Sequence, residues 1–383
     1  MKKLLVLMPV YILLAIPVLA QTTINPDISL IGDFRSFVHN DISREVQNEK
    51  LTIESPSLEL VVAGNLNPYA KANATLAWHG EENAEIEEAF FTIHRGLPLR
   101  TNLRVGKYLL EFGRLNTVHE HAWLFIKRPL PHTAFFGDHG LSDMAVRTSF
   151  LLPTGDLYTE LMVGVLKGDA LMGHHHDHEE EEADIAKSGE QEDEATYAER
   201  TDPGFFGRLT TSHAVGEYSE LAFGVSALNA VYIDETCDET IEAIKLRSWL
   251  LGSDVKFKYK PSRYTALQLE GELILRRAEQ ESGNDLNSLG GYGCIDYRFR
   301  QKYNIGGIAE YVKEKALHEH EGEHEIEETT TWRTGLFVGF APIEETTLVR
   351  LAGHWTEPDE GGGFWEATLQ LVFSLGPHQP HNF

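Results

Sequence analysis

The feature that most constrains the fold of this chain is an alternation of apolar and polar residues that recurs along most of its length. Residues 70–78 read AKANATLAW, in which every second residue is apolar, and residues 99–109 and 365–375 follow the same rule. Successive side chains of a β-strand point to opposite faces of a sheet, so each stretch predicts a strand with one apolar and one polar face. The sequence therefore predicts an all-β fold.

The connections between these stretches alternate between short and long. We count about sixteen stretches with this alternation. They span residues 27–38, 56–66, 69–79, 86–95, 98–112, 141–152, 156–168, 203–213, 217–231, 242–259, 263–277, 287–300, 302–315, 329–341, 345–356 and 362–376. Tight turns at one end, longer loops at the other and aromatic residues near the strand ends are typical of outer-membrane barrels. We therefore predict a transmembrane antiparallel up-and-down β-barrel, because a soluble β-sandwich has no reason for so strict an alternation of connections.

The N-terminal stretch MKKLLVLMPVYILLAIPVLA has the three parts of a secretory signal peptide. Two lysines precede an apolar run over residues 4–17, which is too short to favour a membrane span, and small residues precede position 21. We expect residues 1–20 to be cleaved and residues 21–383 to form the exported barrel; a buried N-terminal helix is the alternative. With only Cys237 and Cys294 we expect no essential disulfide, although the two could pair.

The formal net charge of −26 arises from 33 Lys and Arg against 59 Asp and Glu. It disfavours nucleic acid as a partner, because phosphates are repelled. It also disfavours an anion-selective pore, unless basic residues are segregated. Much of the acidic excess lies in two long connections, at about residues 169–202 and 316–328, which we expect to be extracellular loops.

The signal peptide, the alternating strands and the terminal Phe383 together resemble a Gram-negative outer-membrane porin. Within residues 86–152, the stretches IEEAFFTIHR, LRVGKYLLEFGRLN and GLSDMAVRTSFLLP are similar to the phosphate-selective porin O/P-like barrel superfamily. The resemblance implies a passive channel, contact with outer-membrane lipid and lipopolysaccharide, recognition of Phe383 by the barrel-assembly machinery, and a homotrimer. The tail at residues 376–382 departs from the pattern by containing two prolines, and the acidic charge does not suit phosphate selectivity.

The connection at residues 113–140, GRLNTVHEHAWLFIKRPLPHTAFFGDHG, is too apolar to lie in water. Burying each of its large apolar side chains is worth roughly 1.5–3 kcal/mol. The resemblance implies that this third extracellular loop folds into the barrel and narrows it. The constriction would then carry Arg114, His119, Glu120, His121, Lys127, Arg128, His132, Asp138 and His139.

Four histidines of this connection are candidate metal ligands. His119 and His121, with His132 and His139, offer imidazole near carboxylate in one short segment. Such ligands suit Zn²⁺, Cu²⁺ or Ni²⁺. The alternative is that these histidines hydrogen-bond to turns and to strand backbones.

Basic residues on the polar faces of the predicted strands are candidate pore-lining groups. On the inner face they would oppose carboxylates such as Glu88 and Glu272, and opposed charges order water and favour polar solutes. The alternative is that they only fill a polar lumen and pair with one another. The basic residues are Arg100, Arg104, Arg147, Lys256, Lys258, Arg298, Arg300, Arg333 and Arg350.

A second group of histidines lies in the two acidic loops. Residues 173–182 read GHHHDHEEEE, and residues 318–328 read HEHEGEHEIEE. Tracts of this composition bind divalent transition metals through neutral imidazole, so the sequence predicts loose capture of Zn²⁺ or a similar ion. The alternative is a solvated acidic loop that holds Ca²⁺ or Mg²⁺ between lipopolysaccharides. The candidate ligands are His174, His175, His176, His178, His318, His320 and His324.

Three function classes remain open from the sequence. The first is an outer-membrane channel for small solutes whose loops capture zinc, with no cofactor required. The second is a general porin for organic or sugar solutes with incidental acidic loops. The third is a surface-binding protein anchored by the barrel. An enzyme is not expected, because the chain lacks G-x-S-x-G, H-E-x-x-H and comparable motifs.

Overall fold

The computed structural model describes residues 26–41, 49–80, 83–168, 171, 202–234, 244–279, 285–320, 323–343 and 346–376, with the backbone alone at 232–234, 244–246, 317–320 and 323–325. Its strands are β1 (Asp27–His39), β2 (Thr52–Ile53), β3 (Ser57–Asn67), β4 (Ala70–Trp78), β5 (Glu85–Ile93), β6 (Asn102–Leu109), β7 (Ser142–Leu152), β8 (Tyr158–Leu166), β9 (Gly204–Ala214), β10 (Ser219–Asp234), β11 (Ile244–Ser262), β12 (Thr265–Glu279), β13 (Leu286–Phe299), β14 (Tyr303–His320), β15 (Glu323–Ile343), β16 (Thr347–Pro358) and β17 (Phe364–Leu375).

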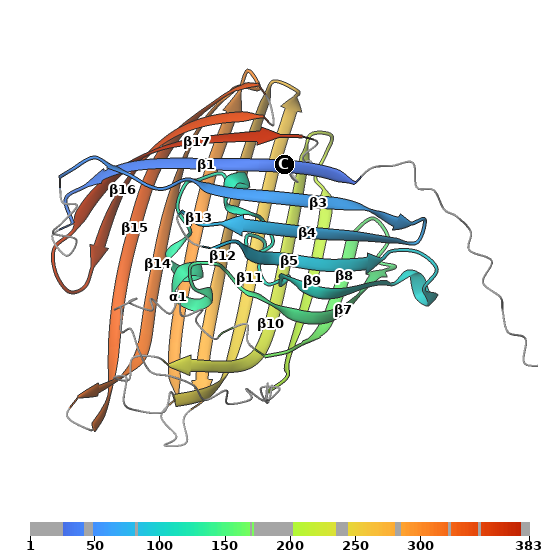
Figure 1. The fold of residues 1–383 in the computed structure, drawn as a ribbon, viewed down its shortest axis with the longest axis horizontal. Helices are drawn as coiled ribbons and strands as arrows, with labels where there is room; N and C mark the ends of the chain where they lie inside the picture. Colours follow the sequence, from blue (N-terminus) through green and yellow to red (C-terminus); the bar gives the residue numbers. More distant parts are fainter. Residues whose placement is uncertain are drawn as a thin grey trace, which may run out of the picture.

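The strands form one closed antiparallel sheet (Figure 1). Apart from β2, which has two residues, each strand pairs with the next one along the chain, and β1 closes the ring by pairing with both β17 and β3. Leu30, for example, lies opposite Leu375 on one side and Leu60 on the other. The predicted barrel of sixteen strands is therefore confirmed, with β2 as a short addition beside β1.

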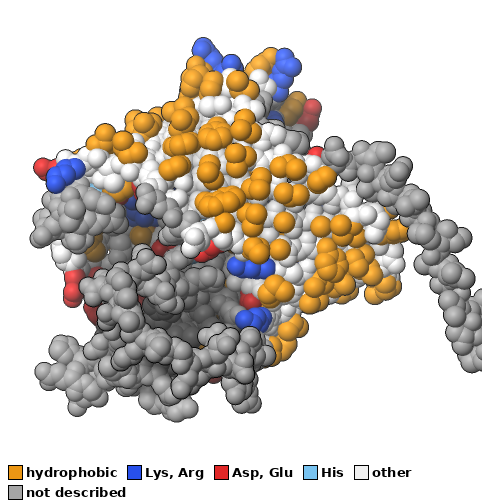
Figure 2. All heavy atoms as spheres, viewed as in Figure 1, with side chains coloured by type: hydrophobic (Ala, Val, Ile, Leu, Met, Phe, Trp, Pro, Cys, Tyr) orange, Lys and Arg blue, Asp and Glu red, His pale blue; other side chains and the backbone are white. Residues whose placement is uncertain are grey.

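The barrel carries its apolar residues outside and its charged residues inside. Along β12, Leu269, Leu273 and Leu275 are exposed on the outer face, whereas Glu272 and Arg276 are buried on the inner face. Hydrophobic side chains likewise spread over the outer face that β3 to β5 present (Figure 2). An apolar band around a polar interior is the arrangement of a barrel whose outer solvent is lipid.

Exposed aromatic residues lie near both ends of the strands. At the end with the longer connections, which we call the loop end, Tyr311 packs on Trp332 with ring centroids 4.4 Å apart. At the opposite turn end, Phe299 stacks on Tyr303, which stacks on Phe340 at 5.1 Å. These positions agree with the predicted aromatic girdles.

One predicted loop is wrong. Residues 316–328 form most of a hairpin instead, because β14 runs to His320, β15 starts at Glu323, and His318 pairs with Glu325. Beyond the bilayer both faces of a strand meet water, so a strand there needs no apolar face and its sequence looks like a loop. Among the described residues, no helix is long and apolar enough to span a membrane.

Candidate functional site

The connection between β6 and β7, residues 110–141, lies against the inner wall of the barrel, and we call it the luminal segment. It contains a short 3-10 turn, η3 (Glu120–Ala122), and one helix, α1 (Leu130–Phe136), which contacts β13 and β14. Figure 1 shows α1 within the outline of the strands. Asn116 joins the two ends of the segment, because its side chain hydrogen-bonds to the backbones of Leu110 and Leu141.

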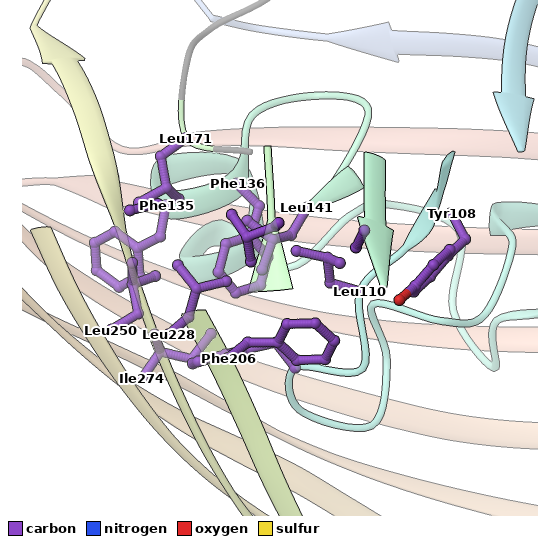
Figure 3. Packing of buried hydrophobic residues seen from close by; sticks show 14 of the residues in the cluster. Tyr108, Leu110, Phe135, Phe136, Leu141, Leu171, Phe206, Leu228, Leu250 and Ile274 are labelled. Carbon is purple, nitrogen blue, oxygen red and sulfur yellow. The ribbon is translucent and has the colours of Figure 1, made fainter. Parts of the chain in front are cut away.

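Two apolar clusters hold the luminal segment to the wall. In the first, Phe135 and Phe136 of α1 pack with Leu228, Leu250 and Ile274 from β10 to β12 (Figure 3). In the second, Trp123, Phe125 and Ile126 pack with Tyr292, Ile308 and Phe337 from β13 to β15. Each side chain buried in this way contributes roughly 1.5–3 kcal/mol. The large apolar residues of the segment therefore serve to dock it inside the barrel.

Charged side chains of the wall bind the backbone of the luminal segment. Arg350 of β16 donates to the carbonyls of Trp123 and Phe125, both at 2.8 Å. Glu272 of β12 accepts the backbone N–H groups of Arg114 and Leu115, both at 2.6 Å. Hydrogen bonds to charged groups in a buried site are the stronger ones, so these contacts fix the position of the segment.

Ion pairs join the segment to the wall and to the strands around it. Arg35 and Arg128 both reach Glu120 at 3.0 Å, and Glu111 accepts from Arg104 at 3.1 Å and from Arg147 at 2.7 Å. Burial alone raises the pKa of Glu120, but Arg35 and Arg128 lower it more, so that its pKa lies below the ordinary value. Further pairs are Arg208–Asp254, Arg114–Asp254, Lys127–Glu366 and Arg333–Glu310.

A cavity of about 710 Å³ remains between the luminal segment and the inner wall of the barrel, where it is lined by β1, β3 to β6, β8, β9, β11 and β12. Its lining is charged on both sides: the basic groups are Lys71, Arg104, Arg114, Arg208 and Lys256, and the acidic groups are Asp27, Glu88, Glu111 and Glu270. A hydrated polar solute fits such a lining, because opposed charges orient its dipole and its water.

His119 lies at the loop end of this cavity among three carboxylates. Its Nδ1 is 3.4 Å from Oε2 of Glu59 and 3.3 Å from Oε2 of Glu87, and its Nε2 is 3.3 Å from Oε2 of Glu88. Burial alone lowers the pKa of His119, but Glu59 and Glu87 raise it more, so its pKa lies well above the ordinary value.

The four histidines of the luminal segment do not form one site. His119 and His121 stack with centroids 5.9 Å apart, and His121 contacts Glu59 at 3.1 Å. His132 instead is buried against Glu272, with Nε2 and Oε2 3.0 Å apart, and packs on Phe136. The ring of His139 packs against that of His79, with ring centroids 5.0 Å apart. His132 is therefore not part of the group around His119, and its metal-ligating role stays a prediction.

The other candidate metal ligands fall outside what can be described. His174, His175, His176 and His178 lie outside the described residues, as does Cys237. The backbone of His318, His320 and His324 lies in β14 and β15, but their side chains are outside the described part. Phe383 is likewise outside it.

Most predicted pore-lining residues face the interior. Arg104, Arg147, Arg298 and Arg350 lie on inward positions of their strands, and Arg114, Glu120, Lys127 and Arg128 lie in the luminal segment. The prediction for Arg100 is wrong, and the one for Asp138 stays a prediction. Arg100 is exposed in a 3-10 turn, η2 (Pro98–Arg100), because the strand starts only at Asn102. Asp138 is exposed in the turn that follows α1.

Several residues of the site were not expected from the sequence. Glu59, Glu87, Glu111 and Asp254 became visible only from their partners in space. One signal was present for Glu87: the adjacent pair Glu87-Glu88 interrupts the alternation of IEEAFF.

Comparisons with known proteins support the fold. No family model matches the chain. An uncharacterized protein of Aquifex aeolicus (strain VF5) is 26% identical, over 95% of this chain and 81% of that protein.

Among solved structures, the anion-selective porin from Comamonas acidovorans is similar with a TM-score of 0.56 and 8% identity, over 92% of this chain and all of that one. OmpT of Vibrio cholerae in its trimer form is similar with a TM-score of 0.56 and 10% identity, over 92% of this chain and 100% of that one. The channel DcaP of Acinetobacter baumannii is similar with a TM-score of 0.54 and 11% identity, over 92% of this chain and 98% of that one. At such identities the likeness shows a porin-like barrel fold.

Proposed function

We propose that this chain is an outer-membrane channel through which small polar solutes diffuse passively. The observation that carries the proposal is the cavity of about 710 Å³ with its charged lining, inside a closed barrel whose outer face is apolar. The luminal segment narrows the interior, so that solutes pass between it and the wall. Passage needs no chemical step and no catalytic residue.

The lining favours polar solutes over apolar ones. Arg104 and Arg147 share Glu111 on one side, and Arg208 pairs with Asp254 on another. Fixed charges of both signs across a narrow passage create a transverse field that orients water and polar solutes. Neither phosphate selectivity nor any single solute class follows from this arrangement.

The cellular context belongs to the same proposal. The signal peptide expected at residues 1–20 supports export to the outer membrane of a Gram-negative bacterium. We extend the proposal to a homotrimer, supported by the trimer form of the similar OmpT. Native mass spectrometry of the protein extracted from membranes tests the homotrimer. A monomeric mass would contradict it.

The capture of transition metal by the acidic loops is a separate, finer proposal. Its support is the composition of GHHHDHEEEE and of the hairpin around His318, His320 and His324. Zinc uptake by cells that carry a barrel without residues 172–201 tests it under zinc starvation. Equal uptake with and without this stretch contradicts it.

Single-channel conductance of the refolded barrel in a planar bilayer tests the channel itself. We expect stable open steps that grow when the luminal segment is shortened between residues 117 and 139. A barrel that is folded and inserted yet carries no current contradicts the channel. The barrel would then serve as the anchor of a surface-binding protein.

A further inference from the structure

Three ligand-type side chains from distant parts of the chain converge at the loop end of the lumen. Glu59 comes from β3, Glu87 from β5 and His119 from the luminal segment. One nitrogen of His119 and one oxygen of each glutamate lie within 4.8 Å of one another. Among the described residues, this is the one group of His, Cys, Asp and Glu that comes so close.

A β-bulge places Glu87 in this group. In the pairing of β4 with β5, Thr75 lies opposite Glu88 and Leu76 lies opposite Ile86, so Glu87 has no partner across the sheet. Ile86 and Ala89 are both exposed, and the two residues between them are not. The bulge thus turns two consecutive glutamates away from the lipid face, where strict alternation would expose one of them. Bulges are frequent where a side chain is re-aimed at a functional site.

The three converging atoms are buried and lack hydrogen-bond partners. Nδ1 of His119, Oε2 of Glu59 and Oε2 of Glu87 each have no partner of good geometry in the described structure. Leaving buried polar atoms without partners is costly, so their alignment needs an explanation. The two nitrogen–oxygen distances are 3.4 and 3.3 Å. Ligand atoms held about 2.0–2.1 Å from a tetrahedral zinc ion are about 3.3 Å apart.

The remaining atoms of two of these side chains have the partners that metal ligands usually have. Nε2 of His119 lies 3.3 Å from Oε2 of Glu88, and Oε1 of Glu59 lies 3.1 Å from Nδ1 of His121. A histidine that binds a metal commonly donates its other N–H to a carboxylate, which orients the ring and raises its basicity. Glu88 is itself held by the backbone N–H of Leu109 at 3.2 Å.

The site has both an entry path and a charge that attracts cations. His119, His121 and Glu88 line the cavity of about 710 Å³, which connects the group to the interior of the barrel. Within the described part of the chain, the basic partners of Glu59 and Glu87 are histidines alone. Three carboxylates, Glu59, Glu87 and Glu88, surround His119, so acidic side chains outnumber the two histidines of the group.

We propose that Glu59, Glu87 and His119 bind one divalent first-row transition-metal ion, with Glu88 and His121 as their hydrogen-bonding partners. An imidazole with two carboxylates suits Zn²⁺, Co²⁺ or Mn²⁺, whereas Ca²⁺ and Mg²⁺ prefer oxygen ligands alone. The alternative to a metal ion is a proton on His119, held between the two carboxylates. The metal site does not depend on conduction, since it needs only the folded barrel.

Anomalous diffraction from crystals of the full-length barrel soaked in Zn²⁺ locates the ion directly. We expect a peak among Glu59, Glu87 and His119. Peaks confined to other parts of the protein, or no peak at all, overturn the proposal. This measurement uses the wild-type chain, so it stands even where a variant fails to fold.

Titration of the refolded barrel with Co²⁺, followed by its visible absorption, gives the number of ions and their affinity. His119→Gln and Glu87→Gln should each bind one ion fewer than wild type. Glu88→Gln should lower the affinity for that ion by about 10–100-fold, because it removes the carboxylate that hydrogen-bonds to the ligand His119. Glu85→Gln, two positions from Glu87 on β5, is the matched control and should bind as wild type.

The histidines at positions 174, 175, 176 and 178 are the same in all these variants, so any ions they hold cancel in the comparison. Equal stoichiometry and affinity for Co²⁺ in wild type and His119→Gln would overturn the proposal. The space among the three side chains would then hold a proton on His119 and no metal ion. Circular dichroism and heat-dependent gel mobility confirm that each variant is folded.

Discussion

His132 of α1 and Glu272 of β12 meet in the interior of the barrel, with Nε2 and Oε2 3.0 Å apart and both side chains almost completely buried. The two residues are 140 positions apart in the sequence. The second oxygen of Glu272 accepts the backbone N–H groups of Arg114 and Leu115. One wall carboxylate therefore holds both the start and the helix of the luminal segment.

Replacing Glu272 by alanine should release the luminal segment. Two backbone donors and the His132 ring lose their partner, and leaving a buried polar group unsatisfied costs about 1–3 kcal/mol. We expect larger and noisier conductance steps and rapid trypsin cleavage after Lys127, while the barrel stays folded. Glu270→Ala, at the next inward position of β12, is the control and should leave cleavage slow. Slow cleavage in both variants would show that Glu272 does not anchor the segment.

Acid should loosen the segment through Glu120. Its pKa is lowered on folding, because Arg35 and Arg128 outweigh the effect of burial. A carboxyl with a lowered pKa stabilises the fold fully above its unfolded value of about 4.3, and this stabilisation is lost as pH falls through the lower folded value. We therefore expect the conductance of wild type to rise below about pH 4.

Glu120→Gln isolates this group from the other carboxylates of the lumen. Asp33, which also pairs with Arg35, is present in both proteins. The variant should already conduct more than wild type at neutral pH and should show a weaker rise in acid. The same acid profile in both proteins would assign the rise to other groups.

The strands were predictable because the bilayer and the lumen impose opposite solvents on the two faces of the wall. Alternation is clear in β17, where Leu369 and Leu371 point to lipid and Thr368 and Gln370 point inward. It fails where the two solvents are no longer different. The hairpin of β14 and β15 around His320 stands beyond the apolar band, so both of its faces are polar and its sequence pattern predicts a loop.

The luminal segment was predictable from its apolar residues, but its partners were not. Phe135 and Trp123 must be buried somewhere, whereas the wall residues that receive them depend on barrel geometry. The same holds for the candidate metal site. His119 was visible from the sequence, but Glu59 meets it only because β3 lies near β5 in the ring, and Glu87 only because of a bulge.

The apolar band predicts a depth dependence for charged substitutions on the outer face. Leu273 lies near the middle of β12 and is 48% exposed. Leu273→Arg should destabilise the barrel by about 2–4 kcal/mol, whereas Leu267→Arg, close to the strand end, should cost about 0–1 kcal/mol. Urea unfolding of the two variants in lipid vesicles measures the difference. Equal costs at the two depths would contradict the placement of the band.

The balance of charge around the cavity predicts a change in ion selectivity at Lys256. This residue of β11 lines the cavity together with Arg114 and Glu270. Lys256→Glu replaces a positive by a negative charge where the passage is narrow, so cations should be favoured over anions more than in wild type. The reversal potential under a KCl gradient should shift accordingly, and the shift should shrink at high salt as the charge is screened. Lys313→Glu makes the same change on a half-exposed residue of β14 that pairs with Glu328 and does not line the cavity, and it should leave the reversal potential unchanged. An equal shift in both variants would mean that ions respond to the net charge of the protein and not to the lining of this cavity.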